Sequence, residues 1–172
     1  AQYVRIWSNG NNADNTNGFA EVQVLSGERT YAQPLPREFR NGAEKREVKL
    51  SDAQASSGEN ANLVRDNKIT TAWFSGRENE SVVTVKVDDK MVQNYELLKN
   101  ITIRWGNQNV KEYRVEVKNQ DGQWNTVYTG TDGNGAAAKI NLEKSVSANA
   151  IRVVCSGKNK ENYPYAIAEI KA

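Results

Sequence analysis

The sequence has 172 residues, of which 38% are hydrophobic and 26% are charged, a composition that fits one domain with a real core and a short additional segment. Lys and Arg number 23 against 21 Asp and Glu, so the formal net charge is only +2. Such a balance provides no basic field for phosphates, and we expect no nucleic-acid partner. A bilayer span needs about 18 consecutive apolar residues. The sequence has no such run, so we expect no membrane insertion.

The chain contains no histidine, which excludes Ser–His and Cys–His catalytic pairs and the common zinc sites. Cys155 is the only cysteine, so no internal disulfide can form. Carboxylate chemistry and oxygen-ligated metals remain. Pairs such as Glu78 and Glu80 exist, but nothing in the sequence brings two carboxylates to the separation that glycoside hydrolysis requires. We therefore expect a protein that is not itself an enzyme.

Short segments that alternate apolar and polar side chains predict β-strands with one face on a core. In chain order the predicted strands cover residues 83–87, 101–105, 113–117, 124–128, 139–142, 150–155 and 165–170. Asp121-Gly122 predicts the tight turn of a hairpin between the third and fourth of these strands. A helical turn or two is expected only near residues 60–66. Strands at a spacing of roughly ten residues predict an all-β sandwich or barrel.

Two distant parts of the sequence resemble each other. Residues 1–10 align with residues 148–157 at an offset of 148 − 1 = 147, and residues 20–22 align with residues 168–170 at an offset of 168 − 20 = 148. An offset of about one domain length favours tandem modules. Chance similarity between two amphipathic hairpins is the alternative.

This repeat predicts how the chain is divided. Residues 1–28 are predicted to be the last two strands of a preceding similar module, forming a hairpin from residues 3–8 and 19–25. Residues 29–43, which include two prolines, are predicted to be a linker. Residues 44–172 are predicted to form the complete module.

Residues 62–73 resemble the Asp-Gly-Asn-x-x-Thr-x-Trp loop of the discoidin family, also called the coagulation factor V/VIII type C family. This family includes the bacterial carbohydrate-binding modules of family 32. The resemblance covers essentially all of residues 44–172 and continues through residues 101–106, 113–117, 121–124, 151–153 and 165–170. Animal members usually bracket the domain with a cysteine pair, so the lone Cys155 places this sequence closer to the bacterial branch. The resemblance implies an antiparallel jelly-roll β-sandwich of about eight strands with its ends near each other.

The resemblance also implies a structural calcium ion near one rim of the sandwich. Carried over to this sequence, its ligands are the carboxylates of Asp66 and Glu169, the hydroxyl and carbonyl of Thr71, and the carbonyls of Leu63, Lys68 and Ala168. Calcium prefers such oxygen donors. Two positions depart from the family, Asn67 where Gly is common and Lys68 where Asn or Asp is common, and the lysine charge should weaken binding. The alternative is that Asp66 caps a turn and Glu169 pairs with a surface cation.

A pyranose is recognised by an aromatic face and by polar side chains that converge on its hydroxyls. The family places such groups in variable loops at one end of the sandwich. The candidate ligand-binding residues in these loops are Phe74, Arg77, Asn107, Asn109, Lys158, Asn159 and Tyr163. Trp73, Trp105 and Trp124 are predicted to pack in the core or at the rim. Histidine, common in the galactose-type sites of the family, is missing.

The sequence therefore predicts a non-catalytic carbohydrate-binding module that is stabilised by calcium. The predicted parent is a secreted, multimodular bacterial protein, a glycoside hydrolase or an adhesin, located outside the cell or on its surface. The predicted partners are a glycan or polysaccharide and neighbouring modules of the same polypeptide. The alternative is a structural or protein-binding discoidin module that serves as a spacer and binds no sugar.

Overall fold

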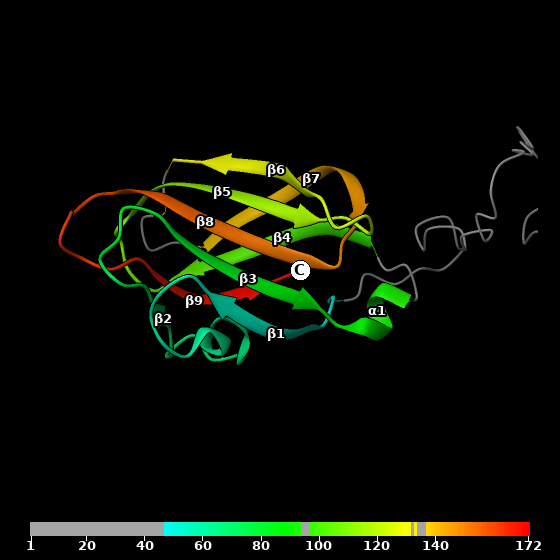
Figure 1. Cartoon of the computed structure of the whole chain (residues 1–172), viewed down its shortest axis with the longest axis horizontal. Helices are drawn as coiled ribbons and strands as arrows, with labels where there is room; N and C mark the ends of the chain where they lie inside the picture. The colour runs from blue at the N-terminus through cyan, green and yellow to red at the C-terminus, as the bar shows by residue number, and fades with distance from the viewer. Residues whose placement is uncertain (1–46, 94–96, 132, 134–136) are drawn as a thin grey trace, which may run out of the picture. The chain divides into compact units, whose positions relative to one another are not determined.

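The computed structural model describes residues 47–93, 97–131, 133 and 137–172 (Figure 1). The predicted hairpin and linker, residues 1–43, lie outside these residues. The described part contains nine strands, one 3-10 helix and one short α-helix. In chain order the elements are β1 (Leu50–Ala55), η2 (Ala61–Arg65), β2 (Trp73–Phe74), β3 (Ser81–Val87), α1 (Asp89–Gln93), β4 (Leu97–Trp105), β5 (Val110–Lys118), β6 (Trp124–Gly130), β7 (Ala137–Ser147), β8 (Ala150–Lys158) and β9 (Ala166–Lys171).

The strands form two antiparallel sheets, with the orders β1-β3-β8-β5-β6 and β2-β9-β4-β7. The sheets lie over one another as two layers (Figure 1). This architecture confirms the predicted all-β sandwich. Strands β4 and β5 follow each other in sequence but belong to different sheets. The polar loop between them, residues 106–109, therefore crosses from one layer to the other.

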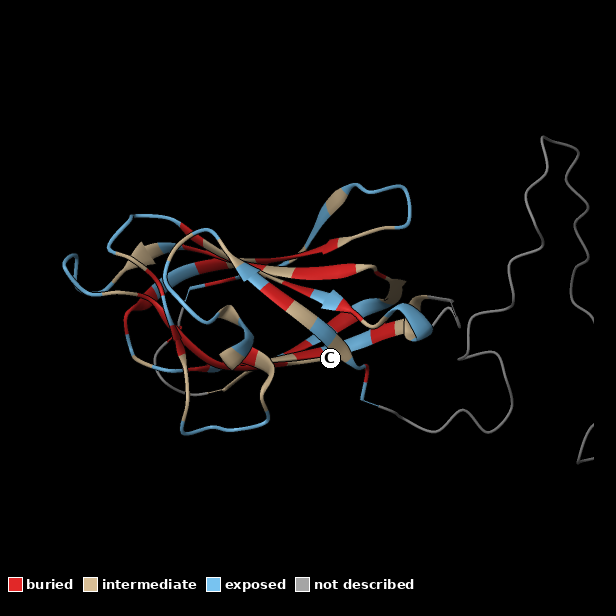
Figure 2. Ribbon diagram, turned by 60° about the horizontal axis from the view of Figure 1, so that its bottom comes forward, coloured by how far each residue is buried: buried red, intermediate tan, exposed pale blue. Residues whose placement is uncertain are grey.

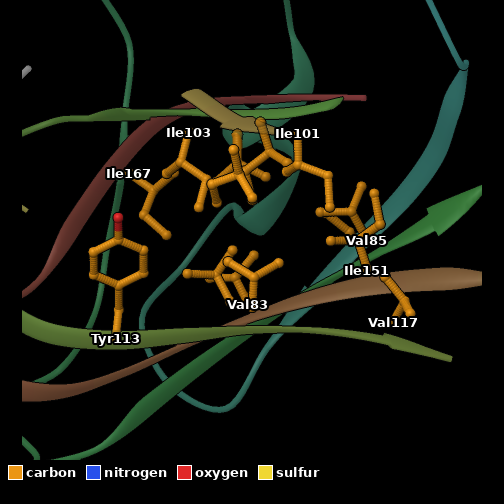
Figure 3. Close-up of a cluster of buried hydrophobic side chains, with 14 of the residues drawn as sticks. Val83, Val85, Ile101, Ile103, Tyr113, Val117, Ile151 and Ile167 are labelled. Atoms are coloured by element: carbon orange, nitrogen blue, oxygen red, sulfur yellow. The ribbon is translucent and has the colours of Figure 1, made fainter. Parts of the chain in front are cut away.

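The core lies between the two sheets because alternate side chains of each strand point inward. Val83 and Val85 from β3 meet Ile101 and Ile103 from β4 (Figure 3). Burying each such side chain stabilises the fold by roughly 1.5 to 3 kcal/mol. Figure 2 shows buried positions alternating with more exposed ones along several strands.

The tryptophans largely follow the prediction of core or rim packing. Trp73 and Trp105 belong to the buried core, whereas Trp124 is half-buried on β6. Cys155 is fully buried on β8, and this burial raises the pKa of its thiol to about 12. The thiol therefore stays protonated at neutral pH.

The predicted turn between β5 and β6 is present. Gly122 adopts a positive φ of 82°, which glycine reaches without steric cost. Asn119 closes the turn, because its backbone N–H donates to the carbonyl of Gln123 at 2.9 Å and its side chain accepts from the N–H of Gln123 at 2.8 Å. The hairpin is thus fixed by its own sequence.

The start and the end of the described module are adjacent. The N–H of Val48 donates to the carbonyl of Ala172 at 2.7 Å. This contact confirms the expectation that the two ends lie near each other. No helix in the described residues is long and apolar enough to cross a membrane.

Candidate ligand and metal sites

Three loops extend from the same end of the sandwich, the end away from α1 in Figure 1. They join β2 to β3 (residues 75–80), β4 to β5 (residues 106–109) and β8 to β9 (residues 159–165). All seven predicted ligand-binding residues lie in these loops or at the strand ends that carry them. Hydrogen bonds between the loops decide which of these side chains face outward.

The amides of the two asparagines in the β4–β5 loop bind backbone groups. Asn109 is only 4% exposed, and its Nδ2 donates to the carbonyl of Tyr163 at 2.8 Å. Its Oδ1 accepts from the N–H of Lys160 at 2.7 Å. Asn107 donates from Nδ2 to the carbonyl of Pro164 at 3.0 Å. These two side chains hold the β8–β9 loop in place.

Asn159 and Lys158 bind the neighbouring loops in turn. Asn159 donates from Nδ2 to the carbonyl of Gln108 at 2.9 Å. The ammonium of Lys158 donates to the carbonyl of Arg77 at 2.8 Å and to that of Glu161 at 3.4 Å. The β8–β9 loop is thus tied to both of the other loops.

Tyr165 lies beneath this junction. The Lys158 ammonium is 5.0 Å from the centroid of the Tyr165 ring, and the Tyr165 hydroxyl donates to the carbonyl of Asn79 at 2.5 Å. Burial raises the pKa of Tyr165 to about 12, and the negative charges that Cys155 and Glu80 carry when ionised act in the same direction. The hydroxyl therefore remains a donor to the β2–β3 loop at any physiological pH.

Three of the predicted residues keep exposed side chains. Phe74 is 50% exposed and Tyr163 is 57% exposed. Arg77 is also exposed, and its guanidinium makes no hydrogen bond or ion pair with any described residue. These side chains offer aromatic faces and a planar donor to solvent at the loop end of the sandwich.

The predicted metal ligands of the loop after η2 lie close together. The hydroxyl of Thr71 donates to Oδ2 of Asp66 at 2.7 Å and is 3.1 Å from the carbonyl oxygen of Lys68. Oδ1 of Asp66 accepts from the backbone N–H of Lys68 at 2.9 Å. The hydrogen bond from Thr71 lowers the pKa of Asp66, and the Lys68 charge acts in the same direction, so the carboxylate is ionised. Three oxygen donors of different type therefore converge in one turn.

Glu169 brings a second carboxylate from β9. It is 2% exposed, and its Oε2 has no hydrogen-bond partner among the described residues. Burial raises the pKa of Glu169 and the charge of Asp66 raises it further, while Lys171 and the N–H of Asn67 oppose the shift. Lys171 itself pairs with Glu47 at 3.1 Å and not with Glu169. The buried oxygen thus lacks the partner that a buried charge requires.

The backbone near Glu169 is irregular in a way that suits a metal ligand. Arg104 pairs with Glu169 and the next residue, Trp105, pairs with Ile167, so Ala168 is the extra residue of a β-bulge. A bulge removes its residue from the regular ladder. Leu63, the other predicted carbonyl ligand outside the loop, lies on η2, which packs against β9.

The two departures from the family pattern are accommodated locally. Asn67 has a φ of 61°, in the left-handed region that asparagine tolerates better than most residues. The side chain of Lys68 is exposed, and its backbone N–H donates to Oδ1 of Asp66. A pocket of about 410 Å³ opens beside Glu169 and Asn67. The described residues contain no cluster of three or more acidic, cysteine or histidine side chains, so a metal here would rest on two carboxylates and neutral oxygens. Such a donor set fits calcium.

One buried polar cluster was not predicted from the sequence. Glu116 on β5 is 7% exposed on the outer face of the five-stranded sheet. It forms ion pairs with Arg152 and with Arg114, the latter at 3.1 Å. Arg152 also lies 4.2 Å from the centroid of the Trp124 ring. The alternation of Arg114, Glu116 and Lys118 signals a polar face, but not which cations meet on Glu116.

Comparison with known proteins identifies the fold. The family model of the F5/8 type C domain matches residues 47–170. Chitosan-binding module 1 of a chitosanase/glucanase from Paenibacillus sp. IK-5 superposes with a TM-score of 0.60 at 25% identity, covering 70% of this chain and 92% of that one. The family 32 carbohydrate-binding module of NanJ from C. perfringens, solved with galactose, gives 0.59 at 20% identity, covering 70% and 90%.

A third solved structure, the family 32 module of AlyQ in complex with 4,5-unsaturated mannuronic acid, has a TM-score of 0.59 at 15% identity. It covers 74% of this chain and 97% of that one. No curated protein has a matching sequence. The described strands therefore have the fold of family 32 carbohydrate-binding modules.

Proposed function

Because the chain belongs to the F5/8 type C domain family, we propose that it is a non-catalytic carbohydrate-binding module. The observation that carries this proposal is the group of Phe74, Arg77 and Tyr163, which stay exposed on loops that are otherwise tied to one another. A chitosan-binding module and a galactose-bound module share the fold, which supports the same kind of ligand here.

The fixed loops favour sugar binding for a physical reason. Side chains presented by ordered loops lose less conformational entropy when a ligand arrives. A monosaccharide of about 12 heavy atoms, held on an open surface at about 0.3 kcal/mol per atom, binds with about −4 kcal/mol. The corresponding Kd is in the millimolar range. Useful attachment would then come from several modules acting together.

Calcium is proposed as a structural cofactor. Asp66, Thr71 and Glu169, with the carbonyls of Leu63, Lys68 and Ala168, are the proposed ligands. Bound there, the ion would supply positive charge beside the buried carboxylate of Glu169. The unpartnered oxygen of Glu169 and the bulge at Ala168 support this assignment. The ligands join the loop after η2 to β9, so the expected role is to stabilise the fold.

The parent protein is proposed to be a secreted, multimodular bacterial protein, either a glycoside hydrolase or an adhesin. The module would act outside the cell or on its surface and would hold its parent on a glycan or polysaccharide. The solved modules with this fold include one from a chitosanase/glucanase, which supports an accessory role beside an enzyme.

The test is titration of the chain with a panel of glycans. We expect Phe74→Ala, Arg77→Ala and Tyr163→Ala each to weaken binding without unfolding the protein. Tyr128→Ala is the matched control, because Tyr128 is an exposed aromatic side chain on β6, outside the loop cluster. Binding that none of the three substitutions changes would place the ligand elsewhere.

A second function is favoured by a specific observation. In four of the seven candidate residues, the polar side chain donates a hydrogen bond to a backbone carbonyl of a neighbouring loop. These residues are Asn107, Asn109, Lys158 and Asn159. A surface whose polar side chains are already hydrogen-bonded within the protein also suits a structural or protein-binding spacer module. The absence of binding to every glycan of the panel would favour this spacer function.

A further inference from the structure

Lys171 lies beside the proposed metal ligand Glu169. The two residues are separated by one position on β9, so their side chains lie on the same face of the four-stranded sheet. The register with β4 is regular at this point, with Thr102 opposite Lys171. A cation is thus placed beside the buried carboxylate, whose Oε2 has no hydrogen-bond partner among the described residues.

Asn67 holds this cation at the loop of proposed ligands. Nζ of Lys171 donates to Oδ1 of Asn67 at 3.1 Å. Asn67 lies between Asp66 and Lys68, and a hydrogen bond from its own N–H lowers the pKa of Glu169. Asn67 thereby joins the ammonium and the carboxylate through its side chain and its backbone. Since this position departs from the family pattern, the contact is a property of this sequence.

The charge of Lys171 also acts on Glu169 directly. Burial raises the pKa of Glu169, and the positive charge of Lys171 lowers it. The ion pair of Lys171 with Glu47 is open to solvent, because the two side chains are 39% and 59% exposed. Exposed ion pairs are weak, so this contact does not remove the influence of the ammonium on Glu169.

The other cations near the proposed ligands are engaged elsewhere or extend into solvent. The guanidinium of Arg65 donates to a side chain of η2 at 2.8 Å and to a carbonyl of β1 at 3.2 Å. Arg104 is opposite Glu169 on β4, but its side chain is exposed and forms no ion pair with a described residue. The side chain of Lys68 is exposed as well. Lys171 is therefore the cation whose contacts reach the ligand loop.

We propose that Lys171 competes with calcium for the carboxylate of Glu169. The inference rests on the proposed calcium site and states how this chain sets the affinity of that site. Without the ion, the ammonium supplies part of the positive charge that a buried carboxylate requires. Calcium at Glu169 would carry the same sign of charge as the ammonium beside it, and this repulsion weakens binding. One side chain therefore stabilises the metal-free module and lowers its affinity for calcium.

Lys171→Gln separates these two effects. In calorimetric titration at about 0.15 M salt, calcium should bind the variant about fivefold more tightly, the effect of one partly exposed charge. With a chelator present, the melting temperature should fall by about 4 °C, because the buried carboxylate loses its nearby cation. At saturating calcium the tighter binding should offset this fall. A purely structural role would instead lower the melting temperature equally in both conditions and leave calcium affinity unchanged.

Asn67→Gly tests the contact that holds the ammonium. The φ of Asn67 is 61°, which glycine adopts without strain, so the substitution removes Oδ1 and keeps the turn. Once released from the loop, the Lys171 ammonium should spend more time in solvent, where its charge is screened. We expect calcium to bind this variant about twofold more tightly.

Lys139→Gln is the matched control. Lys139 is an exposed residue of β7 and, like Lys171, is opposite Thr102. The control removes the same charge from the same face of the four-stranded sheet, but on the far side of β4. It should leave calcium affinity unchanged.

The outcomes separate the competition from the calcium site itself. Equal or weaker calcium binding by Lys171→Gln, or the same tightening in Lys139→Gln, would overturn the competition and leave the site standing. An unchanged affinity in Asn67→Gly would overturn the role of Asn67. Binding by the Lys171 variant alone would support the competition. No binding by this variant or by the unaltered chain up to about 10 mM, above the range of extracellular modules, would overturn the calcium site.

Discussion

The ammonium group of Lys158 lies 2.8 Å from the carbonyl oxygen of Arg77, so a side chain at the end of β8 holds the loop that follows β2. A second contact, 3.4 Å to the carbonyl of Glu161, binds its own loop at the same point. One charged group therefore fixes the backbone on both sides of the exposed surface. Its role is to position neighbouring residues, in addition to any contact with a ligand.

Lys158→Met tests this positioning role. The substitution keeps a long apolar stem but removes the donors to both carbonyls. We expect a loss of about 1 kcal/mol of stability and faster amide hydrogen exchange in residues 75–80. Lys118→Met is the control and should leave this exchange unchanged. Unaltered exchange in the loop of the Lys158 variant would show that the hydrogen bonds do not hold it.

Calcium removal should lower the melting temperature of the chain. An ion that binds only the folded state stabilises it by roughly 2.7 kcal/mol at a hundredfold excess over its Kd. Asp66→Ala should abolish the effect of a chelator while leaving the fold intact. Glu47→Ala is the matched control, since this carboxylate pairs with Lys171 and is not a proposed ligand. An identical melting curve with and without chelator would count against the site.

The ion pairs of Glu116 should make stability sensitive to acid. Burial opposes ionisation of Glu116, but hydrogen bonds from Arg152 and Arg114 outweigh it and lower the pKa below the ordinary 4.5. A carboxyl group with a lowered folded-state pKa contributes stability above its unfolded pKa and loses it as the pH falls through the folded value. Denaturant unfolding between pH 7 and pH 2 should show this loss.

Glu116→Gln should remove this pH-dependent component and destabilise the fold at pH 7 by about 2 kcal/mol, because two guanidinium groups lose a charged acceptor. Glu80→Gln offers a control. Its carboxylate is 55% exposed and 3.5 Å from Arg114, so the expected loss is below about 0.5 kcal/mol. Equal losses for the two variants would contradict a special role of the buried carboxylate.

Cys155 should be inert to thiol reagents in the folded protein. Its side chain is fully buried and its pKa is raised to about 12, so neither access nor thiolate is available. Alkylation followed by mass spectrometry should show labelling only after denaturant is added. Rapid labelling in native buffer would mean that β8 opens locally.

The alternation of apolar and polar side chains predicted the strands because it is a local property, which shows which face of a strand is buried. Val83 and Val85 are buried on β3, where the pattern placed them. Strand β1 was not predicted, since Ser51, Asp52 and Gln54 give it little apolar character. It forms because β3 offers an open edge with which Ala53 and its neighbours pair.

The candidate site was also predicted from the sequence only in part. The sequence placed the candidate residues in loops that the structure gathers at one end. It could not predict that Asn109 is buried, because its partner Tyr163 is 54 residues away, or that Glu116 is buried, because Arg152 is 36 residues away. Hydrogen bonds between residues that are distant in the sequence determine which polar side chains find their partners within the protein. Spacing along the chain does not encode these pairings.

The hydrogen bond between Val48 and Ala172 brings the start and the end of the described module side by side. A domain whose entrance and exit lie side by side can be inserted into the loop of another domain without forcing that loop apart. The same closure allows circular permutation. Joining the two ends by a short linker and opening the exposed turn around Gly122 would keep every strand in its place while moving the termini to another edge of the sandwich.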